Sequence, residues 1–410
     1  MELDRLEHVR ILMYSHDTFG LGHLRRCRAI AHAIVEQFKG VSVLIISGSQ
    51  IAGAFNFRAR VDFVKIPSVI KLYNGQYDSI GEYIEIDEIL EMRKLIIQQT
   101  AQVFEPDIFI VDKEPLGLKG ELVPTLELLR SSKTRTVIGL RDVMDSPRLL
   151  IPEWDQSNMI DLISSYYDRI WVYGPETFWN PLKGFDLPDE ISKRMAYTGF
   201  LDREASSVSG ADAPPLPEKY ILATSGGGGD GIALMEQILA AREFDNDNDF
   251  PIVMVLGPFM KSESRERIRL RASHLPNITV LDFESQMEIL MRDASAIVGM
   301  CGYNTFCEAM SFNKRSLFVP RVNPREEQLI RAKRADELGL CQMLRPEEAA
   351  IPSVLAKKLK ELPFIDEPSK HLATDDMEGL QRICAEVAEL SSPIEVLGDD
   401  NTVSLASQHA

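Results

Sequence analysis

Short apolar runs rich in β-branched residues alternate along the chain with segments whose apolar residues recur at helical spacing. In the first half the runs predicted as buried strands are HVRILMYS, VSVLIISG, VDFVKIP, DIFIVDK, TRTVIGLRD and DRIWVYG, with MAYTGF (195–200) as a last short strand. Helix-length segments such as LRRCRAIAHAIVEQF separate several of them. This alternation predicts a parallel sheet with helices on both faces.

The pattern stops and then begins again. Residues 205–217, ASSVSGADAPPLP, are small and proline-rich and are predicted to be a linker. A second set of predicted strands follows: KYILATS, PIVMVLG, NITVLDF, ASAIVGM, KRSLFVP and CQMLR. We therefore predict an α/β protein of two doubly wound, Rossmann-like domains, 1–204 and 218–390, facing a central cleft, and a disordered tail at 391–410.

Composition narrows the class of function. The formal net charge of -17 argues against nucleic-acid binding and against electrostatic capture by an anionic membrane, although a local basic patch could still contact one. No apolar run is long enough for a transmembrane segment, and five cysteines without a CxxC pair indicate reduced thiols in the cytoplasm. No spacing typical of a metal site occurs, and we expect no cofactor.

A glycine-rich stretch, TSGGGGDG (224–231), joins a predicted strand to a predicted helix. Consecutive glycines let the backbone approach a ligand, and the helix start then presents free N–H groups, as a diphosphate site requires. The P-loop signature is absent, and no acid follows where a dinucleotide fold would hold its ribose. The alternative is a loose turn. The candidate ligand-binding residues here are Gly226, Gly227, Gly228 and Gly229.

Two later helix starts carry acids that chemistry alone does not assign. Thr305 and Glu308 have the spacing of a capping box, but the carboxylate of Glu308 could equally accept hydrogen bonds from ribose hydroxyls. Glu327 and Gln328 open another helix, where a solvated helix start is the simpler interpretation.

In order and spacing these three motifs resemble the C-terminal domain of glycosyltransferase family 28, of the type that builds lipid-linked peptidoglycan precursors. The resemblance covers residues 219–345 well and reaches YTGF (197–200) more thinly. It implies the GT-B fold and a nucleotide-sugar donor held mainly by the second domain. The residues implied in donor binding are Phe283 and Glu284 at the uracil edge, Glu308 at the ribose, the glycines with Gly302, Asn304 and Thr305 at the diphosphate, and Glu327 and Gln328 at the sugar. Asp230 departs from the family pattern, and we expect it to cap the following helix.

The stretch SHDTFGLGHLRRC (15–27) occupies the corresponding place in the first domain. Gly22 lies at a close-approach turn, and His23 at the helix entry is positioned to act as a general base, since the helix dipole disfavours its protonated form. Asp17 could be the base instead, or could orient His23. Other candidates at strand ends are Asp112, Glu114, Arg141 and Asp142. The arginines 25, 26 and 28 cannot all face the cleft at helical spacing, and we expect one to meet the diphosphate and the others to be solvated or ion-paired.

We therefore predict an inverting, metal-independent glycosyltransferase that moves a sugar from a nucleoside diphospho-sugar, most simply a UDP-sugar, to a hydroxyl of a sugar or lipid-linked acceptor. The resemblance favours envelope polysaccharide or glycolipid synthesis at the inner face of the membrane. GxGHxxR also resembles the nucleotide-sugar hydrolase of the pseudaminic acid pathway, which leaves a hydrolase as the alternative, and a non-catalytic sensor ranks third. Long insertions at 69–87 and 142–159 favour an acceptor-binding enzyme over a hydrolase, and RLLIPEW within the second could shelter a lipid, line an interface or pack on its own domain.

Overall fold

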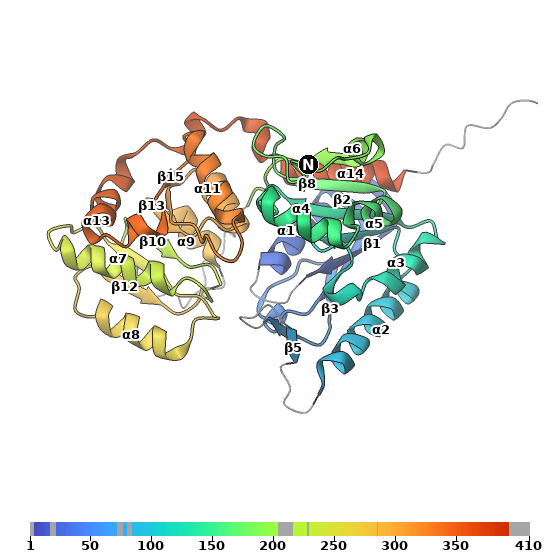
Figure 1. Cartoon of the computed structure of the whole chain (residues 1–410), viewed down its shortest axis with the longest axis horizontal. Coiled ribbons are helices and arrows are strands. Elements are labelled where there is room, and N and C mark those ends of the chain that lie inside the picture. The colour runs from blue at the N-terminus through green and yellow to red at the C-terminus, as the bar shows by residue number, and fades with distance from the viewer. Residues whose placement is uncertain are drawn as a thin grey trace, which may run out of the picture.

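Figure 1 shows two α/β lobes side by side. The computed structural model describes residues 4–16, 22–71, 77–79, 84–203, 216–227, 229–284 and 286–392. Most of the predicted linker and nearly all of the predicted tail lie outside these residues.

The first lobe is built on a seven-stranded parallel sheet in the order β3-β2-β1-β6-β7-β8-β9. Its strands are β1 (Asp4–Ser15), β2 (Phe38–Ser47), β3 (Val61–Lys65), β6 (Ile108–Asp112), β7 (Arg135–Arg141), β8 (Arg169–Tyr173) and β9 (Met195–Tyr197). Its helices are α1 (Gly22–Gln37), α2 (Ile86–Phe104), α3 (Val123–Arg130), α4 (Pro147–Gln156), α5 (Met159–Tyr166) and α6 (Asp189–Arg194). The central strands β6 and β7 are almost wholly buried, because helices cover both faces of the sheet.

The second lobe repeats this design with a six-stranded parallel sheet in the order β12-β11-β10-β13-β14-β15. Its strands are β10 (Ile221–Thr224), β11 (Ile252–Val255), β12 (Ile278–Leu281), β13 (Ala296–Gly299), β14 (Arg315–Phe318) and β15 (Gln342–Met343). Its helices are α7 (Ile232–Phe244), α8 (Ser262–Ala272), α9 (Met287–Asp293), α10 (Tyr303–Ser311), α11 (Glu327–Glu337), α12 (Pro346–Ala349) and α13 (Pro352–Glu361). In both sheets the strand order reverses beside the first strand, β1 or β10, which opens a crevice at the carboxyl ends of the strands.

The two insertions predicted beside the strand ends have structure of their own. The first contains an antiparallel hairpin of β4 (Val69–Lys71) and β5 (Tyr77–Ser79), which the periodicity did not reveal. The second contains α4 and ends where α5 begins. Leu150 and Trp154 of RLLIPEW are buried in the core of their own lobe, where Trp154 packs on Phe185. The apolar side chains of this segment therefore pack on their own domain, while its charged residues Arg148 and Glu153 pair with Glu326 and Arg325 of the second lobe and line the interface between the lobes.

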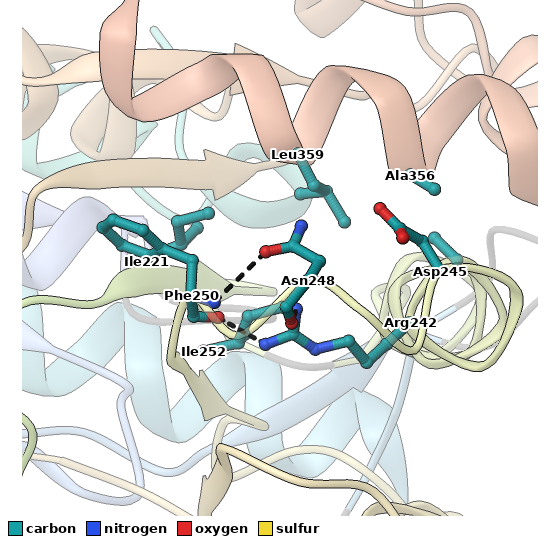
Figure 2. Close-up of a pocket in the computed structure, with 9 residues that line it drawn as sticks. Ile221, Arg242, Asp245, Asn248, Phe250, Ile252, Ala356 and Leu359 are labelled. Carbon is teal, nitrogen blue, oxygen red and sulfur yellow. Dashed lines mark hydrogen bonds between the residues drawn. The ribbon is translucent and has the colours of Figure 1, made fainter.

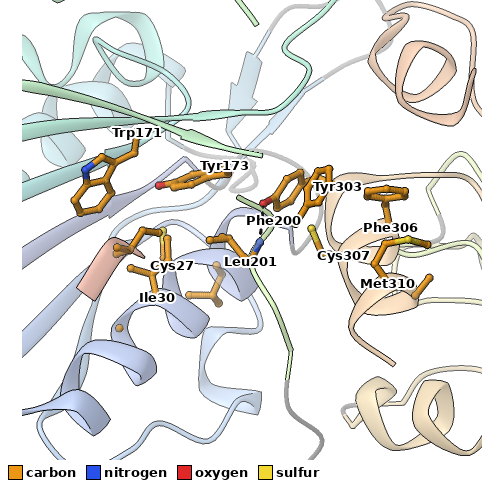
Figure 3. Close-up of a cluster of buried hydrophobic side chains, with 14 of the residues drawn as sticks. Cys27, Ile30, Trp171, Tyr173, Phe200, Leu201, Tyr303, Phe306, Cys307 and Met310 are labelled. Atoms are coloured by element: carbon orange, nitrogen blue, oxygen red, sulfur yellow. Dashed lines mark hydrogen bonds between the residues drawn. The ribbon is translucent and has the colours of Figure 1, made fainter. Parts of the chain in front are cut away.

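A buried apolar cluster joins the two lobes (Figure 3). Phe200, at the exit from the first sheet, packs edge-on against Phe178 and against Phe306 of α10, with ring centroids 5.0 and 5.1 Å apart. Leu201 donates its backbone N–H to the hydroxyl of Tyr303. The lobes therefore share part of one core, which holds their strand ends at a defined separation.

The chain crosses between the lobes twice, and the two crossings lie side by side. Leu201 forms a bridge with Glu378, and Phe200 exchanges backbone hydrogen bonds with Asp376 and Gly379. A Cβ at Gly379 would lie 2.5 Å from the carbonyl oxygen of Phe200, so this crossing requires glycine. The second crossing places α14 (Gly379–Ser391) against α1 of the first lobe, although its residues fall within the range predicted for the second domain (Figure 1).

Candidate functional site

A cleft of about 280 Å³ lies between the carboxyl edges of the two sheets. Thirteen of the candidate catalytic and donor-binding residues line it: Gly22, His23, Gly226, Gly227, Gly229, Phe283, Glu284, Gly302, Asn304, Thr305, Glu308, Glu327 and Gln328. Of the further candidates at strand ends, Arg141 lines it, while Asp112, Glu114 and Asp142 do not. Asp17 and Gly228 lie outside the described residues. Residues from both lobes, far apart in sequence, thus meet in one cleft.

Five helices begin at this cleft or beside it: α1, α7, α9, α10 and α11. Their first turns carry unpaired N–H groups and the positive end of the helix dipole. The cleft is also lined by Arg25, Arg26, Arg141 and Arg321. Four acids line it as well, Asp230, Glu284, Glu308 and Glu327. The helix starts are therefore the feature of the cleft that most favours an anionic ligand.

The loop after β10 requires glycine at two positions, Gly226 and Gly231, for different reasons. Gly226 has a φ of +63°, and a Cβ there would meet no atom within 4 Å, so the backbone faces open space. A Cβ at Gly231 would lie 2.0 Å from that of Ser225, so the helix start can approach the loop only with glycine. The side chain of Ser225 is held by a 2.6 Å hydrogen bond to the carbonyl of Leu256. The loop is therefore built for close approach of its backbone to a ligand.

The prediction that Asp230 caps α7 is wrong, since Gly231 is the N-cap residue. Asp230 instead accepts a 2.7 Å hydrogen bond from Arg321, which follows β14. Arg321 also pairs with Oε1 of Glu327, and its backbone N–H donates to Oε1 of Gln328 at 3.1 Å. This arginine neutralises the acid beside the glycine loop and leaves the amide N–H groups of Gln328 available to a ligand.

Glu308 does not take part in a capping box either. Gly302 is the N-cap of α10, and Glu308 lies one turn further along, fully buried beneath the cleft. Nη2 of Arg25 lies 2.5 Å from its Oε1, yet neither carboxylate oxygen has a hydrogen bond of good geometry to a described residue. Burial raises its pKa to about 7, although Arg25 acts in the opposite direction. A buried carboxylate with unused acceptor capacity is suited to bind hydroxyl groups.

His23 lies at the start of α1 and contacts the end of β6. Its Nδ1 is 2.5 Å from Oδ2 of Asp112, and Arg26 holds both oxygens of Asp112 at 2.6 and 2.7 Å. Burial alone would raise the pKa of Asp112, but Arg26 and His23 hold it well below its usual value. The ionised carboxylate can only accept, so Nδ1 of His23 donates and Nε2 is left as an acceptor.

Burial lowers the pKa of His23 from 6.5 to about 4, against the opposing effect of Asp112. The imidazole is therefore neutral at pH 7. With Nδ1 occupied by Asp112, a neutral His23 has the protonation state and the tautomer of a general base.

Asn304 ties the glycine turn of one lobe to that of the other. Its Nδ2 donates to the carbonyl oxygen of Gly22 at 2.9 Å, and its Oδ1 accepts from Arg203 at 3.1 Å. Both ends of this amide are thus used within the protein, so its contribution is to hold the two turns in register across the cleft.

The sequence alone did not distinguish Asp112 from the other strand-end candidates, nor show which arginines of α1 face the cleft. Asp112 was one of several strand-end candidates, yet it is the acid that contacts His23. Of the three arginines that follow His23, Arg25 and Arg26 line the cleft and are ion-paired with Glu308 and Asp112, while Arg28 packs over the ring of Phe55. The available signal was spacing: Arg26 follows His23 by three residues, so both lie on the same face of α1.

The acidic stretch DNDND (245–249) lies elsewhere. It borders a small recess at the opposite edge of the second sheet, where Arg242 donates to the carbonyl oxygens of Asn248 and Phe250 (Figure 2). The stretch is therefore remote from the cleft. Across the residues that the structure describes, no group of three His, Cys, Asp or Glu side chains is arranged to hold a metal ion, and no helix is long and apolar enough to cross a membrane.

The chain is similar to known proteins over nearly its whole length. Residues 225–383 match the model of the glycosyltransferase family 28 C-terminal domain. An uncharacterized glycosyltransferase of Methanosarcina mazei is 22% identical over 384 residues, which cover 90% of this chain and 92% of the relative. Among solved structures, the kitacinnamycin glycosyltransferase has a TM-score of 0.65 at 14% identity, covering 94% of this chain and 100% of that one. MurG of Acinetobacter baumannii has a TM-score of 0.57 at 14% identity, covering 93% and 99%.

Proposed function

This chain is a glycosyltransferase of the GT-B fold with a C-terminal domain of the family 28 type, and from that premise we propose an inverting enzyme that uses His23 as general base. The donor is a nucleoside diphospho-sugar, with uridine as the base. The observation that carries the proposal is the contact of His23 with Asp112 at the cleft that also gathers the glycine loops and Glu308.

In this mechanism Nε2 of His23 removes the proton from an acceptor hydroxyl. The oxygen attacks the anomeric carbon of the donor, the bond from that carbon to the diphosphate oxygen breaks, and the configuration inverts. Asp112 stabilises the imidazolium that forms, as a buried carboxylate does in a hydrolase triad. Arg26 keeps Asp112 ionised, so it acts as a positioning residue for the base.

The second lobe supplies the donor subsites. The carboxylate of Glu308 accepts hydrogen bonds from the ribose hydroxyls. The turns at 226–229 and 302–305 hold the diphosphate through backbone N–H groups. Glu327 and Gln328 contact the sugar, which agrees with the buried Oε2 of Glu327 having no partner among the described residues. Phe283 and Glu284 lie at the base, and 39% of Phe283 is exposed. The assignment of uridine rests on the likeness to family 28.

The departing diphosphate gains negative charge as the glycosidic bond breaks. The amino ends of α7 and α10 and the arginines of the cleft supply positive charge at that point, so the proposed reaction proceeds without a divalent cation. The acceptor approaches from the first lobe, where His23 lies. We assign the acceptor to the sugars and lipid-linked sugars used in envelope polysaccharide or glycolipid synthesis, at the cytoplasmic face of a membrane, again on the family likeness.

Transfer is favoured over hydrolysis. The relative from Methanosarcina mazei and the kitacinnamycin enzyme, both similar over nearly the full length of this chain, are named as glycosyltransferases. A sensor without activity does not need a base whose tautomer is set by a buried acid.

Two measurements test this proposal. A thermal-shift screen across nucleoside diphospho-sugars should show a rise in melting temperature with UDP-sugars, because a ligand that binds only the native state stabilises it. Stabilisation by another nucleotide alone would overturn the uridine assignment. Release of UDP from the stabilising donor should then be slow without acceptor, while rapid acceptor-free turnover would favour the hydrolase.

A further inference from the structure

Arg141 is the last residue of β7 and lines the same cleft as His23. Strand β7 pairs with β6, where Asp112 is opposite Gly139, so Arg141 lies two residues beyond the level of the acid that orients the base. It belongs to the first lobe and faces the start of α11 in the second, where Glu327 is the acid that most affects its pKa. Arg141 therefore approaches the donor subsites from the acceptor side.

The neighbouring cations each have an acid of their own. Arg26 binds both oxygens of Asp112, and Arg331 binds both oxygens of Asp142 at 2.6 and 2.8 Å. Arg141 differs from them. Its Nε is buried and has no hydrogen-bond partner among the described residues.

The surroundings of Arg141 favour a negative ligand. Burial lowers its pKa, and Arg331 and Arg26 act in the same direction, since like charges disfavour the protonated form. A guanidinium stays charged at neutral pH in spite of this. A buried cation beside two others is stabilised most by an anion, and much less by a neutral hydroxyl.

Glu327 does not satisfy Arg141 by itself. Its Oε1 is bonded to Arg321, while its Oε2 is buried without a partner among the described residues. The two side chains are close enough to shift each other's pKa, yet no hydrogen bond joins them. A ligand between them would bring an acceptor to Arg141 and a donor to Glu327, which is the combination that a sugar phosphate offers.

We propose that Arg141 is a phosphate-binding residue of the cleft, contributed by the lobe that does not carry the donor subsites. The inference deepens the proposed function and rests on it. The phosphate belongs either to the donor diphosphate or to an acceptor that carries its own phosphate. With the donor, Arg141 would stabilise the charge that develops on the leaving group, and it would require the two lobes to be closed before reaction.

The experiment compares binding of uridine, UDP and inorganic phosphate to the full chain and to two variants, Arg141→Gln and Arg141→Lys. Arg130→Gln is the matched control, because it removes one exposed positive charge from the same lobe. The affinity for uridine, measured by calorimetry, should be the same in all three variants as in the wild type. Affinity for UDP should fall about tenfold or more in Arg141→Gln, with partial recovery in Arg141→Lys, since a lysine keeps the charge but loses the bidentate geometry.

The binding measurements distinguish a phosphate of the donor from a phosphate of the acceptor. Loss of UDP affinity assigns the phosphate to the donor. Unchanged UDP affinity, together with loss of inorganic phosphate binding to the UDP-saturated protein, assigns it to the acceptor. If both variants bind UDP and phosphate as the wild type does, the inference is overturned while the proposed function stands. If the wild type binds neither uridine nor UDP, the proposed function itself fails.

Discussion

Nδ1 of His23 and Oδ2 of Asp112 lie 2.5 Å apart, although 89 residues separate them in the chain. One belongs to the helix that follows β1 and the other ends β6, the strand paired with β1. Their contact assigns the tautomer of the histidine and leaves Nε2 as the free acceptor. Among the described acids, Asp112 is therefore the one that orients the proposed base, while Asp17 lies outside the described residues.

The first prediction concerns this contact. His23→Ala should lower kcat for sugar transfer by about 10²–10⁴-fold, the usual contribution of a general base, with the donor Kd within about twofold of wild type. Asp112→Asn should lower kcat comparably, because an amide can donate to Nδ1 and thereby place the proton on Nε2. Steady-state kinetics and donor titration check this, and nearly full activity in folded His23→Ala would remove His23 as the base.

The second prediction concerns pH. The pKa of His23 is lowered to about 4, so its neutral form persists as the pH falls below 6.5. With saturating donor, kcat should therefore decline only as the pH approaches about 4. Arg26 lowers the pKa of His23, so Arg26→Gln should move that decline to higher pH. An acid limb centred near 6.5 in the wild type would show a solvated, unshifted base.

The third prediction concerns the ribose subsite. Burial raises the pKa of Glu308 to about 7, so its carboxylate form dominates only above that pH. Because the ribose hydroxyls donate to the carboxylate, affinity for uridine should fall about tenfold between pH 8 and pH 6. Uridine is the right probe, since its lack of phosphate removes a second titration near pH 6.

Glu308→Gln serves as the control for that titration. It should bind uridine more weakly than wild type at pH 8 and with little dependence on pH, because its amide does not titrate. Equal affinity of wild type and Glu308→Gln at pH 8 would return Glu308 to a structural role.

The fourth prediction concerns the ion pair between the lobes. Arg331 and Asp142 are both fully buried and doubly hydrogen-bonded. Asp142→Leu should lower the free energy of unfolding by about 3–5 kcal/mol, because it leaves an uncompensated buried cation, and the double variant with Arg331→Leu should recover most of it. Thermal or urea unfolding measures both.

Arg267→Gln is the comparison for that effect. Its partner Glu236 lies on the surface of the second lobe, and the pair is 60% and 37% exposed. A loss within about 1 kcal/mol is expected there. If Asp142→Leu costs no more than Arg267→Gln, the buried pair does not hold the lobes together.

Local sequence patterns predicted many of the residues that line this site. The glycines at 226–231, Glu308, Glu327 and Gln328 all follow strands, and parallel strands deliver their carboxyl ends to one edge of a sheet, so these residues had to gather there. His23 was placed by the same rule. The hairpin of β4 and β5 escaped prediction because three-residue strands carry too little periodicity to distinguish them from a loop.

The sequence did not predict which acidic side chain contacts which basic one. Glu308 and Asp230 both carried signals for helix capping, and in the structure each instead faces an arginine, Arg25 from the other lobe and Arg321 from another strand end. Which acid meets which base depends on how two sheets are placed against each other, and that placement is set by the shared core around Phe200 and Phe306. Periodicity and glycine spacing determined two α/β sheets and the edge where a ligand binds, because both are local properties of the chain. The tertiary structure alone selected Asp112 as the partner of His23 and left Arg141 without one, because burial and charge neighbours exist only once the lobes have packed.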